Sequence, residues 1–424
     1  MIKQRTLVVH PARSSSENGR LPEARLAEAV GLAEAIDLEI AGAEVVSLSR
    51  PRPATLLGSG NVERLANLVK EREIGLVVID SHLTPGQQRN LEKAFDAKVI
   101  DRTGLILEIF GARARTREGT LQVELASLTY QKSRLVRSWT HLERQRGGFG
   151  FLGGPGETQI EADRRMIGER IVKLKKELVE VKRTRELHRK ARKRVPYPIV
   201  ALVGYTNAGK STLFNRLTSS DVVAKDQLFA TLDPTMRLLD LPSGRKIILS
   251  DTVGFVSDLP HELVASFRAT LEEVLEADLL VHVRDVAHPD TESQAKDVET
   301  VLRDLGVGDK VDLGLIEAWN KIDLLDEHGR HEVFNQVRRD KKLIAISAVS
   351  GEGVGPLLNM LDERLAAERQ VLTVDVKLED GATLAWLYRH GDVLRREDDE
   401  ACAHLLVRLD AVDAGRFESR NSQN

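Results

Sequence analysis

The chain has 424 residues, a formal net charge of −3 and one cysteine, Cys402. A single cysteine excludes an intramolecular disulfide framework and a metal site built from cysteines, and it is consistent with a reducing compartment. No apolar run reaches the roughly 18 residues of a membrane span, and the N-terminal stretch has no signal-peptide core, so we expect a cytoplasmic protein of several domains.

Strand and helix signals alternate in residues 1–112. The runs TLVVH and GLVVID are typical of short buried strands, and PEARLAEAVGLAEAI, GNVERLANLVKERE and TPGQQRNLEKAF have the spacing of amphipathic helices. This alternation predicts a small α/β domain with a parallel sheet. The glycines of LLGSGNVERL lack the other residues of a phosphate motif, so we interpret them as a plain turn before a helix.

Two apolar seven-residue repeats follow in residues 113–195. The first consists of Leu121, Leu128, Leu135 and Leu142, with Leu125 and Trp139 between them; the second consists of Ile160, Ile167, Leu174, Val181 and His188, with Ile171 and Leu178 between them. Such spacing is typical of a coiled-coil seam, and two seams joined by a glycine-rich turn predict an antiparallel helical hairpin. Arms of about thirty residues would hold the turn roughly 45 Å from their base.

The turn, QRGGFGFLGGPGETQIE, contains a G-x-G-x-x-G match at Gly148, Gly150 and Gly153. A dinucleotide loop requires a strand before it, and here a helical seam precedes it instead. We therefore interpret the turn as the functional tip of a long hairpin and not as a nucleotide site. The alternative is a structural hairpin whose tip has no role.

The second arm of the hairpin is strongly basic. Residues 164–194 contain fourteen Lys or Arg against four Glu, a net charge of +10. A basic helix in an acidic chain favours a polyanionic partner, although a solvated charged face is the alternative. The seam is narrow and has no broad Trp, Phe and Leu face, which favours nucleic acid over a membrane surface.

A phosphate loop begins the next domain, residues 196–368, where VPYPIV ends the helix and starts a strand. In LVGYTNAGKSTLFNRL, residues Gly204, Gly209, Lys210 and Ser211 fit G-x-x-x-x-G-K-[ST] between a strand and an amphipathic helix. The glycines allow backbone N–H groups to turn toward phosphates. Lys210 supplies a charge for the β- and γ-phosphates, and the hydroxyl of Ser211 suits magnesium.

A second motif, RKIILSDTVG, supports this site. Asp251 ends a hydrophobic strand 47 residues after Gly204, where it can hold magnesium through water. The N–H of Gly254 can meet the γ-phosphate. Between the two motifs lies FATLDPTMR, in which we favour Thr231 as the second magnesium ligand and keep Thr235 as the alternative.

The sequence NKID, after the strand LGLIEAW, predicts selection of guanine. Asp323 can accept hydrogen bonds from the N1–H and 2-amino groups of guanine, whereas adenine offers neither donor. Leaving such acceptors unpaired can discriminate by a factor on the order of 10⁴. We expect Asn320 to tie the base loop to the phosphate loop, the stem of Lys321 to stack on the purine, and the backbone of Ser347 and Ala348 to contact the guanine carbonyl.

These motifs predict a doubly wound, mostly parallel GTPase domain. Its predicted nucleotide-binding residues are Gly204, Tyr205, Thr206, Asn207, Ala208, Gly209, Lys210, Ser211, Thr212, Phe229, Ala230, Thr231, Leu232, Asp233, Asp251, Thr252, Val253, Gly254, Asn320, Lys321, Ile322, Asp323, Ser347, Ala348 and Val349. The predicted Mg²⁺ ligands are Ser211 and Thr231. The predicted catalytic residues are Lys210, Gly254 and Asn207.

Two positions bear on the rate of hydrolysis. Phe255 follows DTVG, where Ras-like enzymes carry a glutamine that orients the attacking water, so we predict slow hydrolysis by the chain alone. A partner or an ion would then complete the site. Asn207 lies where some potassium-stimulated GTPases hold a monovalent cation, and it predicts either a K⁺ site or an asparagine that only shapes the loop.

Residues 369–424 predict a small, acidic α+β domain. VLTVDVKL is typical of a strand, GATLAWLYRHG of a helix, and two more strands are expected by the end of ACAHLLVRLDAV. We expect the last residues, ESRNSQN, to form a frayed tail.

Several of these segments carry a family resemblance. The segments are DRTGLILEIF, LQVEL, GGPGETQIEADRR, LVGYTNAGKSTLFNRL, FATLDPT and DTVGF. Together they resemble the HflX family of translation-associated GTPases over nearly the whole chain. The resemblance implies a GTPase that acts on the large ribosomal subunit under stress, and some members split stalled or idle ribosomes. It also implies that the N-terminal domain docks on ribosomal RNA and that hydrolysis releases the grip.

The family places the hairpin tip near the peptidyl-transferase centre, which maps this role onto residues 147–159. Leu152 stands where the family commonly has a basic residue, so we expect RNA contact to rest on Arg144, Arg146, Arg164 and Arg165. The far N-terminus and the residues after about 370 match the family poorly.

Two other functions compete with this reading. One is a GTP-gated stress-response binding or scaffold protein in which hydrolysis is incidental. The other is an ATP-driven RNA remodeller, which conflicts with Asp323. In each case we expect a monomer in solution.

Overall fold

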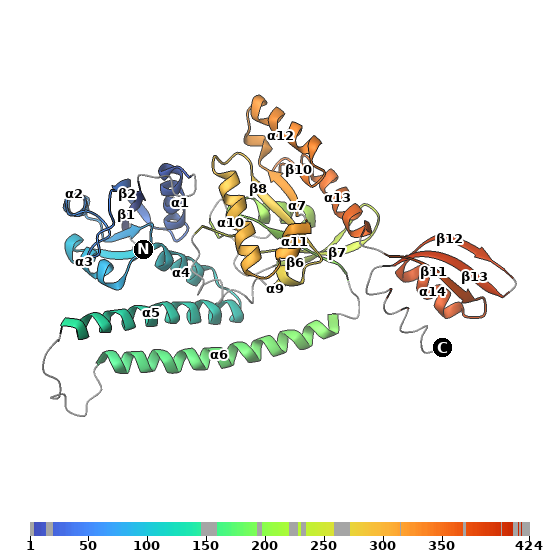
Figure 1. Ribbon diagram of the computed structural model, residues 1–424, viewed down its shortest axis with the longest axis horizontal. Coiled ribbons are helices and arrows are strands. Elements are labelled where there is room, and N and C mark those ends of the chain that lie inside the picture. Colours follow the sequence, from blue (N-terminus) through green and yellow to red (C-terminus); the bar gives the residue numbers. More distant parts are fainter. Residues whose placement is uncertain are drawn as a thin grey trace. The chain divides into compact units, whose positions relative to one another are not determined.

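The computed structural model describes residues 4–13, 20–145, 159–192, 197–219, 228–229, 235–257, 272–313, 315–367, 370–399, 401–409, 414 and 417 (Figure 1). The chain divides into two compact units, Met1–Leu239 with Ile247–Val354, and Asp240–Lys246 with Gly355–Asn424. The domain boundaries at residues 112, 195 and 368 stay predictions. None of the helices in the described ranges combines the length and apolar character needed to cross a bilayer.

A four-stranded parallel sheet begins the first unit. Its strands are β1 (Arg5–Arg13), β2 (Glu39–Leu48), β3 (Leu76–Ile79) and β4 (Lys98–Asp101), in the order β2-β1-β3-β4. Its helices are α1 (Pro22–Glu34), α2 (Ser59–Glu71), α3 (Pro85–Phe95) and α4 (Arg102–Arg113). The strands and helices predicted for this region are present. The sequence patterns missed β2, β4 and α4.

Alternate residues of β1 face two cores. Leu7 and Val9 lie in a cluster with buried residues of α2 and α3, whereas Val8 lies in a cluster with α1 and α4. Successive side chains of a strand point to opposite faces, so both faces of this sheet are covered by helices. Local caps fix two of those helices. Thr84 and Gln87 form a capping box at the start of α3, and Asp101 accepts a hydrogen bond from the N–H of Gly104 at the start of α4.

The predicted hairpin is present as α5 (Arg117–Gln145) and α6 (Gln159–Arg192), which lie side by side (Figure 1). Their seam consists of Leu121, Leu125, Leu128, Leu174, Leu178 and Val181. Arg170 forms a bidentate ion pair with Glu124, with N–O distances of 2.7 and 2.8 Å. The side chains of Trp139, Leu142, Ile160 and His188, and residues 146–158 at the tip, lie outside the described residues.

The base of the hairpin is attached to the N-terminal sheet. Val123 and Ala126 of α5 are buried in the same cluster as α1 and α4. Asp101 accepts hydrogen bonds from the hydroxyl of Tyr130 at 2.6 Å and from the guanidinium of Arg134 at 3.1 Å. Helix α5 therefore packs on two sides, against α6 and against the N-terminal domain.

A six-stranded sheet also lies almost entirely in the first unit. Its strands are β5 (Ile199–Val203), β6 (Thr235–Asp240), β7 (Lys246–Asp251), β8 (Leu279–Asp285), β9 (Ile316–Asn320) and β10 (Leu343–Ala345), in the order β10-β9-β8-β5-β7-β6. Its helices include α7 (Lys210–Thr218), α9 (Glu272–Glu276), α10 (Thr291–Asp304), α11 (Gly308–Leu313) and α12 (Glu327–Arg339). The pairings β5–β7, β5–β8, β8–β9 and β9–β10 are parallel, as predicted. Loops after these strands therefore gather at one edge.

The second unit contains α13 (Val354–Ala367) and a three-stranded antiparallel sheet. The strands are β11 (Gln370–Lys377), β12 (Asp392–Asp398) and β13 (Cys402–Leu409), in the order β11-β13-β12, and α14 (Gly381–His390) lies between β11 and β12 in the chain. Buried Leu387 of α14 shares a cluster with Val374, Leu405 and Val407 of the sheet. The predicted succession of strand, helix and two strands is confirmed.

We predict that Leu174→Ala loosens the hairpin. The Leu174 side chain is fully buried in the seam, and such truncations cost about 2–5 kcal/mol because a cavity remains. Amide hydrogen exchange should therefore accelerate along α5 and α6. Val172→Ala on the same helix is the control, because Val172 is 54% exposed. Equal exchange in the two variants would contradict the packing described above.

Candidate nucleotide-binding site

The loop between β5 and α7 is shaped by two glycines. Gly204 has φ +153°, and a Cβ there would lie 2.2 Å from the carbonyl oxygen of Val283 on β8. Gly209 has φ +93°, and a Cβ there would lie 2.2 Å from Nδ2 of Asn320. Neither position can hold a side chain without moving its neighbours, so the loop passes close to β8 and β9. Helix α7 begins directly after it, with its N-terminal N–H groups toward the loop.

Lys210 is 5% exposed, and its Nζ donates to the carbonyl oxygens of Gly204 at 3.1 Å and Tyr205 at 2.8 Å. Burial lowers the pKa of Lys210 to about 8, although Asp251 opposes the shift. The Oγ of Ser211 donates to the carboxylate of Asp251 at 2.7 Å. Phosphates would approach a buried cation here, beside a hydroxyl and a carboxylate.

The oxygen atoms of Ser211 and Asp251 fit the magnesium ion that the fold implies. Mg²⁺ prefers hard oxygen ligands and keeps several of its waters, which suits one hydroxyl with a carboxylate acting through water. Asp251 is fully buried at the end of β7, so its position is fixed. Thr231, the other predicted ligand, lies outside the described residues, whereas its competitor Thr235 begins β6.

The DTVG segment runs along the phosphate loop. The N–H of Phe255 donates to the carbonyl of Gly204 at 3.1 Å, and its carbonyl accepts from the N–H of Thr206 at 2.7 Å. A Cβ on Gly254 would lie 2.7 Å from Cα of Thr206, so only glycine permits this approach. The hydroxyl of Thr252 donates to the carbonyl of Leu202 at 2.6 Å and fixes the start of the segment.

Phe255 is 1% exposed, and its ring lies in the hydrophobic core. An apolar side chain that points inward cannot orient a water molecule at the phosphates. This agrees with the prediction that the usual water-positioning group is missing at this position.

The predicted link between base loop and phosphate loop is present. Nδ2 of Asn320 donates to the carbonyl of Ala208 at 2.8 Å, and Oδ1 accepts from the N–H of Ala348 at 2.9 Å. Lys321 has φ +67°, and its Nζ pairs with Asp285 at 2.8 Å. Asp323 follows on the exposed side of a short 3-10 turn, Ile322–Leu324, where its carboxylate can meet a base.

The remaining predicted residues are distributed as follows. Tyr205, Thr206, Ala208, Phe229, Val253, Ile322 and Ser347 are buried, Val349 is 69% exposed, and Thr212 lies in the first turn of α7. The Oγ1 of Thr206 accepts a hydrogen bond from the N–H of Phe229 at 2.8 Å. Ala230, Leu232, Asp233, Arg146 and the side chain of Arg144 lie outside the described residues, whereas Arg164 and Arg165 are exposed on α6. Their roles in binding stay predictions.

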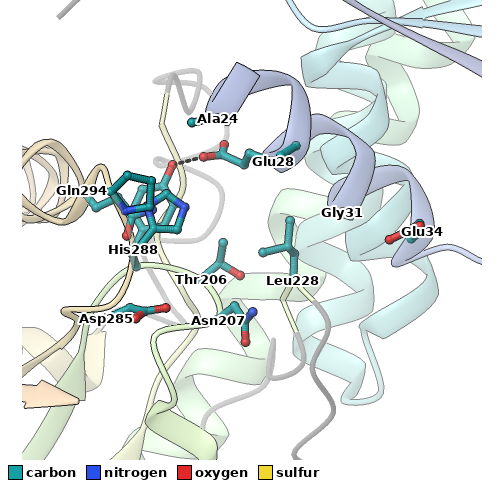
Figure 2. A pocket seen from close by; sticks show the side chains of 13 residues that line it. Ala24, Glu28, Gly31, Glu34, Thr206, Asn207, Leu228, Asp285, His288 and Gln294 are labelled. Carbon is teal, nitrogen blue, oxygen red and sulfur yellow. Dashed lines mark hydrogen bonds between the residues drawn. The ribbon is translucent and has the colours of Figure 1, made fainter. Parts of the chain in front are cut away.

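A cavity of about 560 Å³ next to the phosphate loop is lined partly by residues that the sequence motifs do not indicate (Figure 2). Thr206 and Asn207 line it together with Asp285, His288 and Gln294, and Ala24, Glu28, Gly31 and Glu34 of α1 complete the wall. The hydroxyl of Tyr205 donates to Glu28 at 2.7 Å. No local pattern could have indicated Glu28, because it occupies an ordinary position of an amphipathic helix.

Family models match four successive parts of the chain. They are described as GTP-binding GTPase N-terminal (residues 23–111), GTP-binding GTPase Middle Region (113–192), 50S ribosome-binding GTPase (199–321) and HflX C-terminal domain (332–423). The last match corrects our expectation that residues after about 370 depart from the family.

Whole-chain relatives agree. The GTPase HflX of Magnetococcus marinus is 54% identical over 395 residues, covering 93% of this chain and 90% of that protein. The GTPase HflX of Escherichia coli K12 is 43% identical over 378 residues, covering 88% and 87%. The chain belongs to the HflX family. It is therefore a GTPase.

Among solved structures, the chain is similar to a crystal structure of SsGBP in complex with GDP. The match covers 86% of this chain and 98% of SsGBP, at 24% identity and a TM-score of 0.49.

We predict that Asp323→Asn exchanges guanine selectivity for xanthine selectivity in this HflX family member. Compared with the carboxylate of Asp323, the asparagine amide has one acceptor fewer and gains an N–H donor. That donor suits the 2-carbonyl of xanthine and not the 2-amino group of guanine. Affinity for GTP should fall about ten- to hundredfold, since hydrogen bonds to charged groups are among the strongest. Fluorescence titration with GTP and with XTP measures the affinity for each nucleotide. Glu327→Gln, an exposed control nearby, should bind GTP normally. Unchanged GTP affinity in Asp323→Asn would remove this residue from the base site.

Proposed function

We propose that this GTPase binds the large ribosomal subunit in its GTP state and separates the subunits of stalled or idle ribosomes under stress, in the cytoplasm. The observation that carries the proposal is a basic helical hairpin whose first helix packs on the N-terminal domain of a GTPase. The family description of residues 199–321 as a 50S ribosome-binding GTPase supports the same partner.

The hairpin has the physical properties of an RNA-binding arm. On α6, Arg164, Arg165, Lys173, Lys175 and Lys176 are exposed, while Leu174 and Leu178 face α5. These Lys and Arg side chains therefore lie on the outer surface of the helical hairpin, where the phosphates of a nucleic acid can reach them. Binding of this kind releases counterions and weakens steeply as salt rises.

The hydrolysis mechanism that we propose depends on positioning and charge. Lys210 would place a buried positive charge at the β- and γ-phosphates, and the N–H of Gly254 would donate to the γ-phosphate. Ser211 and Asp251 would hold magnesium, which neutralises charge on the phosphates when bound. Because Phe255 points into the core, hydrolysis is slow until the ribosome or a monovalent cation completes the site.

A GTP-gated binding protein with incidental hydrolysis is the second candidate, and the exposed arm alone would suit it equally. The two functions differ in turnover. Purified large subunits should stimulate GTPase activity strongly if hydrolysis times release from the ribosome. Absence of stimulation, with retained binding, would favour the second candidate.

We predict that Arg164→Glu with Arg165→Glu weakens sedimentation with large subunits in GTP, while GTP affinity stays unchanged. Two lost phosphate contacts should also reduce the slope of log affinity against log salt by about two. The matched control is Arg338→Glu with Arg339→Glu on α12, which makes the same charge change on an exposed pair of the GTPase domain. If both variants bind ribosomes as the wild type does, Arg164 and Arg165 of α6 do not contact the large subunit.

We also predict faster GTP hydrolysis in K⁺ than in Na⁺ at equal ionic strength. Asn207 has φ +59° and is exposed beside the cavity of Figure 2, where its amide oxygen can contribute to a cation site. Asn207→Ala should remove the difference between the two salts without abolishing nucleotide binding. Equal wild-type rates in the two buffers would show that this asparagine only shapes the loop.

A further inference from the structure

One buried arginine joins the N-terminal domain to the segment after DTVG. Arg102, the first residue of α4, is 4% exposed. Its Nε and Nη2 donate to the carbonyl of Ser257 at 3.3 and 3.2 Å, and Nη2 donates to the Ser257 hydroxyl at 3.0 Å. Ser257 lies three residues after Gly254, the residue predicted to meet the γ-phosphate.

Carboxylates of the N-terminal domain hold this arginine in place. Asp80, directly after β3, accepts a hydrogen bond from Nη1 of Arg102 at 2.6 Å and pairs with His10 at 2.8 Å. Glu28 pairs with Nη2 of Arg102. Burial alone would raise the pKa of Asp80, but Arg102 and His10 hold it well below its usual value. The guanidinium is therefore a fixed, charged group, and Ser257 supplies part of its hydrogen-bonding shell.

The phosphate loop joins the same cluster through Tyr205. Its hydroxyl donates to Glu28 at 2.7 Å and accepts from the N–H of Ser257 at 2.9 Å. The segment that precedes Thr231 is also held, because Phe110 of α4 packs edge-to-face on Phe229 with ring centroids 4.8 Å apart. Three parts of the GTPase domain that are predicted to surround the phosphates thus contact α1 or α4.

The cluster of charged and polar residues around Arg102 is also connected to the hairpin. Asp101 immediately precedes Arg102, and its two carboxylate oxygens accept from Tyr130 and Arg134 of α5. A shift of Arg102 would therefore shift the residue that anchors the hairpin. Two adjacent residues contact the GTPase domain on one side and α5 on the other.

We propose that the Asp101–Arg102 pair is the junction through which the nucleotide bound by the GTPase domain controls the base of the helical hairpin. A movement of Ser257 that accompanies the γ-phosphate removes acceptors from a buried guanidinium, and buried unsatisfied donors are costly. The two nucleotide states then differ in the free energy of the contacts made by α4. Because such coupling is reciprocal, the junction also sets the relative affinity for GTP and GDP. The inference requires GTP binding but no ribosomal partner.

The test is amide hydrogen exchange on the full chain, with GDP and with a non-hydrolysable GTP analogue. In the wild type, exchange of residues 117–134 should differ between the two nucleotides by about fivefold or more, the lower end of typical coupling between sites. Arg102→Lys keeps the charge but cannot span Ser257, Asp80 and Glu28 together, so it should abolish the difference. Arg89→Lys, on the exposed face of α3, should keep it.

A second variant breaks the junction on the hairpin side, in case Arg102→Lys does not fold and fails to bind GDP. Tyr130→Phe with Arg134→Gln removes both bonds from α5 to Asp101 and should also abolish the nucleotide-dependent difference in α5. This variant should still bind GDP, which shows that it is folded, because no residue predicted to contact the nucleotide changes. The proposal is overturned if the wild type shows no difference, or if the difference persists in a folded variant of either kind.

Discussion

The close approach of the phosphate loop to its neighbouring strands determines where the other groups of the site lie. Gly204 packs against the carbonyl of Val283, and Gly209 packs against the amide of Asn320. With no side chains in between, the loop lies directly against β8 and the end of β9, and the hydrogen bonds of Asn320 then fix the base loop relative to the phosphate loop. The predicted base site and the predicted phosphate site thus depend on one connected set of close contacts.

Much of this arrangement could be predicted because it is local. Gly204, Lys210 and Ser211 lie within eight residues, and a glycine-rich loop between a strand and a helix has few conformations available to it. The hairpin was equally predictable, since a seven-residue apolar repeat specifies its own partner face. Strand β2 was missed for the opposite reason: most of its side chains are exposed or half-buried at a sheet edge, so it lacks a continuous apolar run.

The contacts of Glu28 and Arg102 could not be predicted from any pattern. Glu28 meets Tyr205 across 177 residues of sequence, and Arg102 meets Ser257 across 155. Glu28 occupies an ordinary position of an amphipathic helix, and Arg102 lies in DRTGLILEIF, one of the segments that carry the family resemblance, but neither position indicates its partner in the folded chain. Burying such charges is favourable only when every partner is in place, which makes the cluster sensitive to small displacements.

The two arms of the hairpin are not equivalent. Helix α5 packs on two sides, against α6 at the seam and, through Val123 and Ala126, against the N-terminal core. Among the side chains of α6 that the structure describes, the exposed ones are charged residues and scattered apolar residues. Substitutions in α5 therefore disturb the scaffold, while the outer surface of α6 can vary widely at little cost in folding free energy. The exposed surface of the hairpin can therefore change through substitutions in α6 while α5 keeps the hairpin attached to the N-terminal domain.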